Sequence, residues 1–226
     1  MIRDCETHGY FRAERCPICG EEGKFLMSPY EVERLGRTLA GVLRHGKFEL
    51  EMDEQGFVNI RDIISEVRDR NPRMKWLRPH HIEALVETDP KGRYQISGAD
   101  VRATYGHTIE LELNHPTDNI PYTLYYPTTE EESDIVLETG LVPSDRAMVH
   151  LSRTYFDAVR AGSVRTDDPV ILEIDVLGCE EVGIIIGRAA KTVFLCKSVP
   201  PEFLTIVTED EFYEDDDLED DEGGEE

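Results

Sequence analysis

The sequence predicts an α+β protein with four successive segments: a small N-terminal ribbon over residues 1–27, a winged-helix-like lobe over 28–114, a mixed α/β lobe over 115–208 and an acidic, disordered tail over 209–226. Three observations lead to this prediction. Cysteine and histidine recur at short spacings near the N-terminus. Helical periodicity then dominates up to a segment rich in proline and asparagine at 113–121, and short apolar runs follow it. The last residues are almost all acidic.

Length and hydropathy exclude several classes of protein. The 226 residues suffice for one large domain or two modest ones with real cores. No apolar run approaches the ~18 residues that cross a bilayer, and the N-terminus lacks the apolar region of a signal peptide. We therefore expect a soluble, cytoplasmic monomer with no membrane partner.

The charge is strongly negative, at −24, and 13 of the 48 acidic residues lie in the segment 209–226. Such a segment cannot bury enough apolar surface to fold. The acidic, lysine-poor composition suits a salt-rich cytoplasm as well as an ordinary acidic cytosolic protein. It argues against non-specific nucleic-acid binding through a broad basic face, but it allows a small pocket that grips one phosphate.

Four residues near the N-terminus have the spacing of a metal site, Cys5-x-x-His8 followed by Cys16-x-x-Cys19. Two ligand pairs of this kind can place four nitrogen and sulfur ligands on one ion, which is the closed tetrahedral site of structural zinc. The alternatives are thiols without a metal or a disulfide, which a reducing cytoplasm disfavours. The sequence therefore predicts a structural zinc ion.

The first long helix should follow Ser28, because Glu31 completes a capping box with it. Arg44 and His45 close this helix, and Gly46 stops it. Two cations at a helix end fit an anion grip, and they equally fit a simple complement to the helix dipole.

Further elements complete this lobe. Two more helices and two strands are predicted, at 59–71, after Pro79, at 93–96 and, with strict alternation, at 108–113. Three helices and a small strand pair are typical of a winged-helix unit.

The loop expected between those strands carries Arg102 and His107 on either side of Gly106. Exposed polar side chains on a wing are one interpretation. A second contribution to an anion site is the other, and the residues alone leave both open.

Residues 115–208 contain many short elements. Strands are predicted at 123–126, 148–152, 170–174, 182–186 and 192–196, and helices at 130–138 and 154–160. This pattern favours a compact, largely antiparallel α+β lobe. Cys179 and Cys196 lie among apolar residues and are expected to be core thiols.

Seven short motifs, in order and in register, resemble those of the RNA 2′-phosphotransferase family, and the resemblance runs from about Tyr30 to Leu204. They are Leu43-Arg44-His45, Gly56-Phe57-Val58, Asp89-Pro90-Lys91-Gly92-Arg93-Tyr94, Val101-Arg102-Ala103 with Gly106-His107-Thr108, Gly140-Leu141, Arg146 with Val149-His150-Leu151-Ser152, and Lys191-Thr192-Val193-Phe194. One such motif would be weak support, whereas seven together favour the family strongly.

The resemblance implies an RNA-binding winged-helix lobe and an NAD-binding lobe of ADP-ribosyltransferase fold. It implies NAD-dependent removal of an RNA 2′-phosphate, as at a tRNA splice junction, through an ADP-ribosylated phosphate intermediate. The products would be RNA with a 2′-OH, nicotinamide and ADP-ribose 1″,2″-cyclic phosphate. The family's catalytic set maps onto Arg44, His45, Arg102 and Arg146. Arginine forks suit a phosphate that carries nearly two charges.

The resemblance places NAD binding at Tyr126, Thr128, His150 and Ser152. His150 and Ser152 match the family's His-x-Ser pair. The other motif departs from the family's His-Gly-Thr, because Tyr126 stands in place of histidine and Pro127 in place of glycine. Proline also removes a backbone N–H.

Two alternative functions stay open. One is an ADP-ribosyltransferase that acts on another phosphate end or target, for which the altered Tyr126-Pro127 motif leaves room. The other is a non-enzymatic zinc-ribbon and winged-helix protein that binds nucleic acid, although the chain is acidic and the helix after Pro79 carries little positive charge. No Rossmann fingerprint is present, so NAD would bind without a parallel-sheet nucleotide fold.

Overall fold

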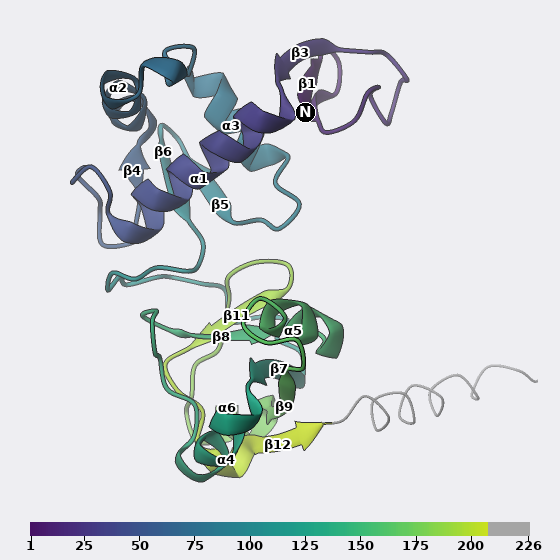
Figure 1. Cartoon of the computed structure of the whole chain (residues 1–226), viewed down its shortest axis with the longest axis vertical. Coiled ribbons are helices and arrows are strands. Elements are labelled where there is room, and N and C mark those ends of the chain that lie inside the picture. Colours follow the sequence, from purple (N-terminus) through teal and green to yellow (C-terminus); the bar gives the residue numbers. More distant parts are fainter. Residues whose placement is uncertain (208–226) are drawn as a thin grey trace, which may run out of the picture. The chain divides into compact units, whose positions relative to one another are not determined.

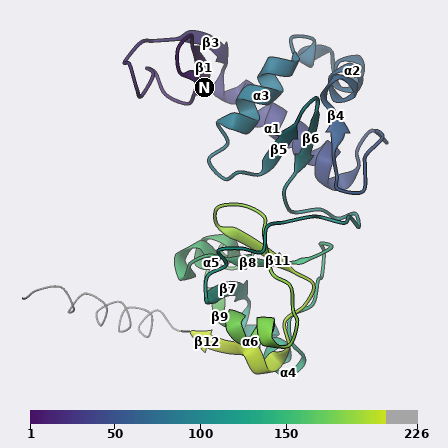
Figure 2. The same cartoon turned by 180° about the vertical axis from the view of Figure 1, so that it is seen from behind.

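The computed structural model describes residues 1–207, and the chain divides into two compact units, Met1–Asn114 and His115 onward (Figures 1 and 2). The predicted acidic tail, 209–226, lies outside the described residues. None of the helices within residues 1–207 has both the length and the apolar character needed to cross a membrane.

The first unit begins with a three-stranded antiparallel ribbon of order β2-β1-β3. Its strands are β1 (Ile2–Cys5), β2 (Gly9–Phe11) and β3 (Lys24–Met27). A small core of Cys5, Phe11 and Cys16 holds the ribbon together. Because this core is so small, a cross-link is needed to stabilise it.

Helix α1 (Pro29–His45) confirms the predicted capping box. The Ser28 hydroxyl accepts the N–H of Glu31 at 3.3 Å, and the Glu31 carboxylate accepts the N–H of Ser28 at 2.8 Å. The helix ends at Gly46, whose φ of +60° is the left-handed conformation that glycine adopts without strain. The apolar face of α1 is fully buried and carries Leu35, Leu39, Val42 and Leu43.

Two helices and a small sheet pack against α1. They are α2 (Ile60–Arg70), a 3₁₀ turn (Pro72–Met74) and α3 (Pro79–Glu87), with an antiparallel sheet of order β4-β6-β5. The sheet contains β4 (Val58–Asn59), β5 (Tyr94–Ser97) and β6 (Asp100–Ala103). The three helices and β5 agree with the sequence prediction, whereas β6 lies where a loop was expected. The winged-helix class stays a prediction.

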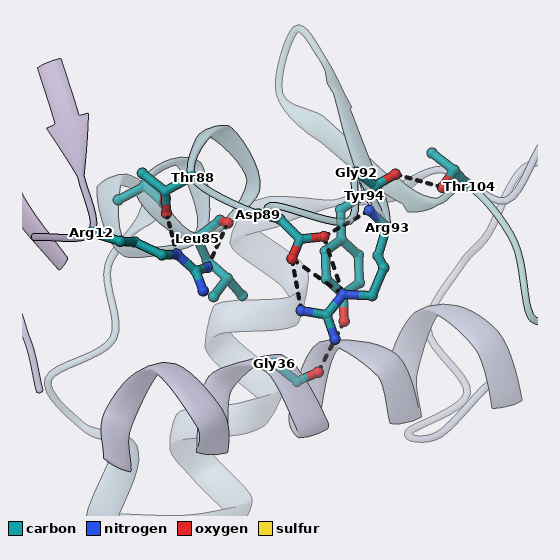
Figure 3. A network of polar contacts seen from close by, with 10 residues as sticks. Arg12, Gly36, Leu85, Thr88, Asp89, Gly92, Arg93, Tyr94 and Thr104 are labelled. Atoms are coloured by element: carbon teal, nitrogen blue, oxygen red, sulfur yellow. Dashed lines mark hydrogen bonds and ion pairs between the residues drawn. The ribbon is translucent and has the colours of Figure 1, made fainter. Parts of the chain in front are cut away.

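A polar network ties the ribbon to this helical part (Figure 3). Arg12, just after β2, donates from Nε to the Thr88 hydroxyl at 3.0 Å. Beside it, Asp89 is buried and accepts from the Arg93 backbone N–H at 2.7 Å and from the Arg93 Nη2 at 2.7 Å. The Tyr94 hydroxyl donates to the carbonyl of Gly36 in α1 at 3.0 Å.

The strand predicted at 108–113 is wrong. The segment has no strand structure and is held by backbone contacts at its two ends. The Thr108 N–H donates to the Arg44 carbonyl at 3.1 Å, and the Glu112 N–H donates to the Glu54 carbonyl at 2.9 Å. The alternating residues therefore reflect a segment with one side against the protein, not a paired strand.

The second unit contains an antiparallel six-stranded sheet of order β10-β11-β8-β7-β9-β12. The strands are β7 (Thr123–Thr128), β8 (Val149–Ser152), β9 (Val170–Asp175), β10 (Gly187–Arg188), β11 (Val193–Cys196) and β12 (Leu204–Val207). The helices are α4 (Glu130–Thr139), α5 (Tyr155–Gly162), α6 (Val176–Glu181) and a 3₁₀ turn (Pro201–Phe203).

The strand predicted at 182–186 is also wrong. Asp175 caps α6 instead, since its carboxylate accepts the N–H of Gly178 at 3.0 Å. The chain then turns and pairs only at Gly187–Arg188. The apolar run misled the prediction because Ile184 and Ile186 pack on the core from a loop, whereas Val182 and Ile185 are exposed.

Candidate functional site

Arg44 lies on the side of α1 opposite its core face, because it follows the buried Leu35 by nine residues, or two and a half turns. It is nevertheless half-buried. The guanidinium lies 4.9 Å from the centre of the Tyr105 ring. Its Nε and Nη2 are buried and have no hydrogen-bond partner among the described residues. A cation with two such donors is suited to an anionic ligand.

Gly106 makes room for that guanidinium. A Cβ at this position would lie 3.1 Å from the Arg44 Cζ, and its φ of +84° is a conformation that other residues rarely adopt. The family-like Gly106-His107-Thr108 motif therefore has a physical basis here, because a larger residue would displace Arg44.

His45 is exposed at the end of α1. Its Nδ1 lies 3.1 Å from the Thr108 hydroxyl oxygen. The Thr108 N–H also donates to the carbonyl of Arg44. Thr108 thus fixes both the helix end and the imidazole, a contact that the sequence did not predict.

Arg102 is on β6 and only 6% exposed, so the prediction of a loop position and the interpretation as an exposed wing residue are both wrong. Its Nε donates to the Gln95 Oε1 at 2.9 Å, and its Nη1 donates to the carbonyl of Gln55 at 3.3 Å. The guanidinium lies 4.7 Å from the centre of the Phe57 ring. Burial lowers the pKa of Arg102, and nearby Asp53 opposes that shift.

Gly56 brings the Arg102 region and the 106–108 segment together. Its φ is +84°, and a Cβ there would lie 3.7 Å from the Nε2 of His107 and 4.0 Å from the Cβ of Arg102. The first unit therefore gathers Arg44, His45 and Arg102 around one short segment, 102–108. Among residues 1–207, neither Arg44 nor Arg102 forms an ion pair.

The remaining predicted catalytic residue, Arg146, belongs to the second unit. It is exposed in the loop before β8. The sequence could not indicate its surroundings, because a loop residue carries no periodicity.

The sheet of the second unit opens between β7 and β8. These strands have a single registered pair, Tyr125 opposite Ser152, whereas β7 pairs with β9 along its whole length. Beyond that pair, 126–128 and 149–151 diverge, and both views place β8 with β11 apart from β7, β9 and β12 (Figures 1 and 2). The result is a fork whose edges present backbone groups.

The four predicted cofactor residues occupy both faces of this fork. Opposite residues share a face and neighbours alternate, so Ser152 and His150 face the same side as Tyr125. Tyr126 and Thr128 face the other side, where Tyr126 packs on the main core. The His150 Nδ1 donates to the carbonyl of Met148 at 2.9 Å, which orients its ring.

Pro127 fits the fork. It lies opposite Ile171 of β9 and has no registered partner on its β8 side, where a missing N–H is tolerated. Its ring packs closely on α5, since a Cβ on Gly162 would lie 2.8 Å from the Cβ of Pro127.

Tyr126 and Thr128 lie near an ion pair that sequence reasoning missed. Burial raises the pKa of Tyr126, and nearby Arg165 opposes that shift. The Thr128 hydroxyl donates to the Glu132 carboxylate at 3.5 Å, and Glu132 pairs with Arg165 at 2.9 Å. No periodicity could have indicated this pair, because its members are 33 residues apart.

The predicted metal ligands come together in the ribbon. The ligand atoms of Cys5, His8, Cys16 and Cys19 all lie within 4.8 Å of one another. The Cys5 Sγ lies 3.5 Å from the His8 Nδ1 and 3.7 Å from the Cys19 Sγ, close to the ~3.5–3.8 Å between ligands of a tetrahedral zinc ion. Backbone hydrogen bonds, chiefly with Cys19, lower the pKa of Cys16 to about 6, which favours the thiolate that a metal binds.

Comparison with known proteins identifies relatives of the whole chain. Residues 30–198 match the family described as RNA 2′-phosphotransferase, Tpt1/KptA. A probable RNA 2′-phosphotransferase of Thermoplasma volcanium is 42% identical over 223 residues, which cover 97% of this chain and 94% of that protein. A probable RNA 2′-phosphotransferase of Methanosarcina barkeri is 40% identical over 211 residues, which cover 92% of this chain and 100% of that protein.

Proposed function

The chain belongs to the Tpt1/KptA family of RNA 2′-phosphotransferases, and from this premise we propose that it removes an RNA 2′-phosphate in an NAD⁺-dependent reaction that uses Arg44, His45, Arg102 and Arg146. The single observation that carries the proposal is the state of Arg44. Its buried Nε and Nη2 have no hydrogen-bond partner in the described part of the chain, which is costly unless a ligand normally satisfies them.

A phosphate monoester fits this arrangement. It carries nearly two negative charges, and a guanidinium fork binds two of its oxygens at once. The aromatic rings of Tyr105 and Phe57 support the guanidinium groups of Arg44 and Arg102 and limit their rotation. Because the donors are positioned before the ligand arrives, they also stabilise charge that develops on the phosphoryl oxygens.

NAD⁺ supplies the ADP-ribose that the RNA 2′-phosphate takes up as nicotinamide leaves, and the final products are RNA with a 2′-OH and ADP-ribose 1″,2″-cyclic phosphate. The fork between β7 and β8 supports this part of the proposal. His150 and Ser152 bind the cofactor on one face of the fork, and Tyr126 and Thr128 contribute from the other edge. Exposed strand edges offer the backbone donors and acceptors that a polar dinucleotide needs.

The natural substrate in this proposal is a tRNA with a splice-junction 2′-phosphate. The Cys5, His8, Cys16 and Cys19 cluster holds a structural zinc ion, since four ligands close the coordination sphere and leave no position for a reacting water. The RNA-binding lobe is of winged-helix type, and the NAD-binding lobe is of ADP-ribosyltransferase type.

The decisive experiment incubates the purified full chain with NAD⁺ and a short 2′-phosphorylated oligonucleotide. We expect release of nicotinamide and a 2′-OH oligonucleotide in equal amounts. The Arg102→Lys variant should lose most of this activity, because an ammonium cannot reproduce the fork. An intact 2′-phosphate after prolonged incubation across a range of salt concentrations would overturn the proposal.

One departure favours a second candidate with the same fold. Tyr126 and Pro127 replace the histidine and glycine expected in the cofactor motif. The alternative reaction leaves ADP-ribose attached to a phosphate end of RNA or DNA. Mass spectrometry of the products separates the two, because only the first reaction yields the cyclic phosphate. Family membership favours either transferase over a non-enzymatic nucleic-acid-binding protein.

A further inference from the structure

A groove runs along α1 in the first unit, and none of its lining residues belongs to the segment 102–108. Its volume is about 400 Å³. We call it the α1 groove, and its lining residues are Tyr30, Glu33, Arg34, Arg37, Thr38, Gly41, Lys47 and Phe48. It belongs to neither the metal cluster nor the cation set described above.

The charge of the α1 groove is opposite to that of the chain. Arg34, Arg37 and Lys47 face a single carboxylate, that of Glu33, whereas the whole chain carries −24. Glu33 pairs with Arg37 where both side chains are largely exposed, so this pair is weak and easily exchanged. A local excess of cations on an acidic protein marks a surface for a polyanion.

Two of these cations are held in place. Arg34 donates from Nη2 to the Oδ1 of Asn71 at 2.7 Å, which fixes its fork at the groove. Lys47 folds back across α1 over Gly41, where a Cβ would lie only 2.9 Å from the Lys47 Cδ. The Lys47 N–H also donates to the carbonyl of Gly41 at 3.1 Å. Because Gly41 has no side chain, the Lys47 side chain can lie against the helix at this point.

Aromatic rings lie at both ends of the α1 groove. Tyr30 is 64% exposed at the start of the helix, which offers a ring face to a flat partner. Phe48 has a φ of +77°, a strained conformation for a bulky residue, and its ring lies 5.2 Å from the Arg70 guanidinium carbon. Phe48 is partly buried against the core, so the exposed ring of the groove is that of Tyr30. Cations beside an exposed aromatic ring are a usual means of holding a single-stranded nucleic acid.

The α1 groove is aligned with the candidate catalytic arginine. Tyr30, Arg37 and Arg44 follow one another at intervals of seven residues, which is nearly two helical turns, so they form one stripe. Successive members lie about 10 Å apart along the axis. A strand with one phosphate at Arg44 therefore needs only a few nucleotides to reach the groove.

We propose that the α1 groove binds the RNA strand next to the 2′-phosphorylated nucleotide, with backbone phosphates on Arg34, Arg37 and Lys47 and a base stacked on Tyr30. This inference rests on the proposed function only in taking RNA as the substrate. It assigns the groove a role in affinity for long substrates and none in the chemical step.

The test compares a 2′-phosphorylated dinucleotide with two 20-nucleotide RNAs, one extended on the 5′ side and one on the 3′ side of the phosphate. The variant is the triple substitution Arg34→Gln, Arg37→Gln and Lys47→Gln in the full chain. We expect KM for at least one long RNA to rise about 10- to 50-fold, with kcat and the dinucleotide kinetics unchanged. The slope of log K for RNA binding against log salt concentration should become less negative by about 2, because each of the three lost phosphate contacts contributes ~0.7.

A matched control removes three exposed cations elsewhere, with Arg61→Gln, Arg160→Gln and Lys197→Gln. It makes the same change in net charge and should leave KM for both long RNAs within about twofold of the wild type. A second variant, Tyr30→Ala, should weaken binding of the long RNA by about fivefold without altering the salt dependence, because stacking releases few counterions.

Two outcomes would overturn the inference: an unchanged KM for both long RNAs, or an equal loss with the dinucleotide. Direct binding of a 20-nucleotide RNA without a 2′-phosphate, followed by fluorescence anisotropy, separates it from the proposed function. If the wild type fails to turn over any substrate but the triple variant loses this binding, the proposed function falls and the groove stands. Thermal melting of each variant checks that the fold is intact.

Discussion

Two regions of the first unit use arginine in opposite ways. Asp89 and Arg93 form an ion pair in which the carboxylate accepts hydrogen bonds from the Arg93 backbone N–H and from two side-chain nitrogens (Figure 3). Burial alone would raise the pKa of Asp89, but the hydrogen bonds with Arg93 outweigh it and hold that pKa below its ordinary value. The guanidinium groups of Arg44 and Arg102 rest on aromatic rings instead and have no carboxylate partner within residues 1–207, although Arg102 also donates to the Gln95 side chain and to the Gln55 carbonyl.

The difference distinguishes a structural arginine from one prepared for a ligand. In a chain with 48 acidic residues, a carboxylate partner for Arg44 or Arg102 would be easy to supply. A ring face orients the guanidinium plane but leaves its N–H groups able to bind an anion. Substitutions in the two regions should therefore affect different measured quantities.

The largest effect is expected from Arg44→Ala. It removes Nε and Nη2, two donors without a hydrogen-bond partner among residues 1–207, so kcat/KM for a 2′-phosphorylated oligonucleotide should fall by about 10²–10³-fold. Stability should change by less than about 1 kcal/mol, because Arg44 forms no ion pair with any residue that the structure describes. Steady-state kinetics and urea unfolding measure the two quantities. If Arg44→Ala lost much stability but kept its activity, Arg44 would be a structural arginine and not one prepared for a ligand.

Asp89→Ala should give the opposite result. It leaves the Arg93 guanidinium and backbone N–H without their acceptor, and the free energy of unfolding should fall by about 2–4 kcal/mol. Activity at a temperature where the variant stays folded should remain within about threefold. Glu33→Ala is the matched control, since it removes an exposed carboxylate from an arginine pair and should cost less than about 0.5 kcal/mol.

Loss of the metal should have a local effect of intermediate size. Cys16→Ser removes one of four ligands, and we expect the bound zinc to drop from one per chain to well below one half by elemental analysis. The melting temperature should fall by about 3–8 °C, because the ribbon packs on the helical part through Arg12. Ser144→Ala, at an exposed position, provides a control. An unchanged metal content would refute the ligand set.

The histidines extend the comparison to pH. Burial, with a smaller contribution from His80, lowers the pKa of His81 from 6.5 to about 4. Between pH 6.5 and about 4 the unfolded state therefore binds a proton that the folded state does not. The stability that the neutral His81 provides is complete above pH 6.5 and is lost as the pH falls toward 4. The free energy of unfolding should drop by about 2 kcal/mol over that window. Urea titrations at pH 7, 5.5 and 4.5 measure it, and His81→Gln should remove much of the slope.

Local signals in the sequence were sufficient for α1 to α5 and for the Cys/His cluster, but they did not predict the short helix α6. Capping at Ser28 depends on residues three apart, and the Cys5–Cys19 spacing needs only short turns. The alternation of apolar and polar residues at 108–113 led to a wrong strand prediction, because a segment that contacts the protein on one side has the same pattern as a paired strand. The burial of Arg102 could not be predicted, since Phe57 and Gln95 reach it from other strands and turns.

The candidate site shows the same limit. The motif resemblance gave Arg44 and Arg102 as candidates, but not the rings beneath them or the space that Gly56 and Gly106 leave around them. The fork between β7 and β8 depends on where strand pairing stops. Pairing is a property of two distant segments together, so neither segment alone contains the signal.

The single registered pair between β7 and β8 also affects how the second unit unfolds locally. On one side of Tyr125 and Ser152, β7, β9 and β12 form one ladder, and on the other side β8, β11 and β10 form a second. Each ladder can exchange amide protons as its own cooperative block. A ligand that enters between the blocks meets only one registered pair, that of Tyr125 and Ser152.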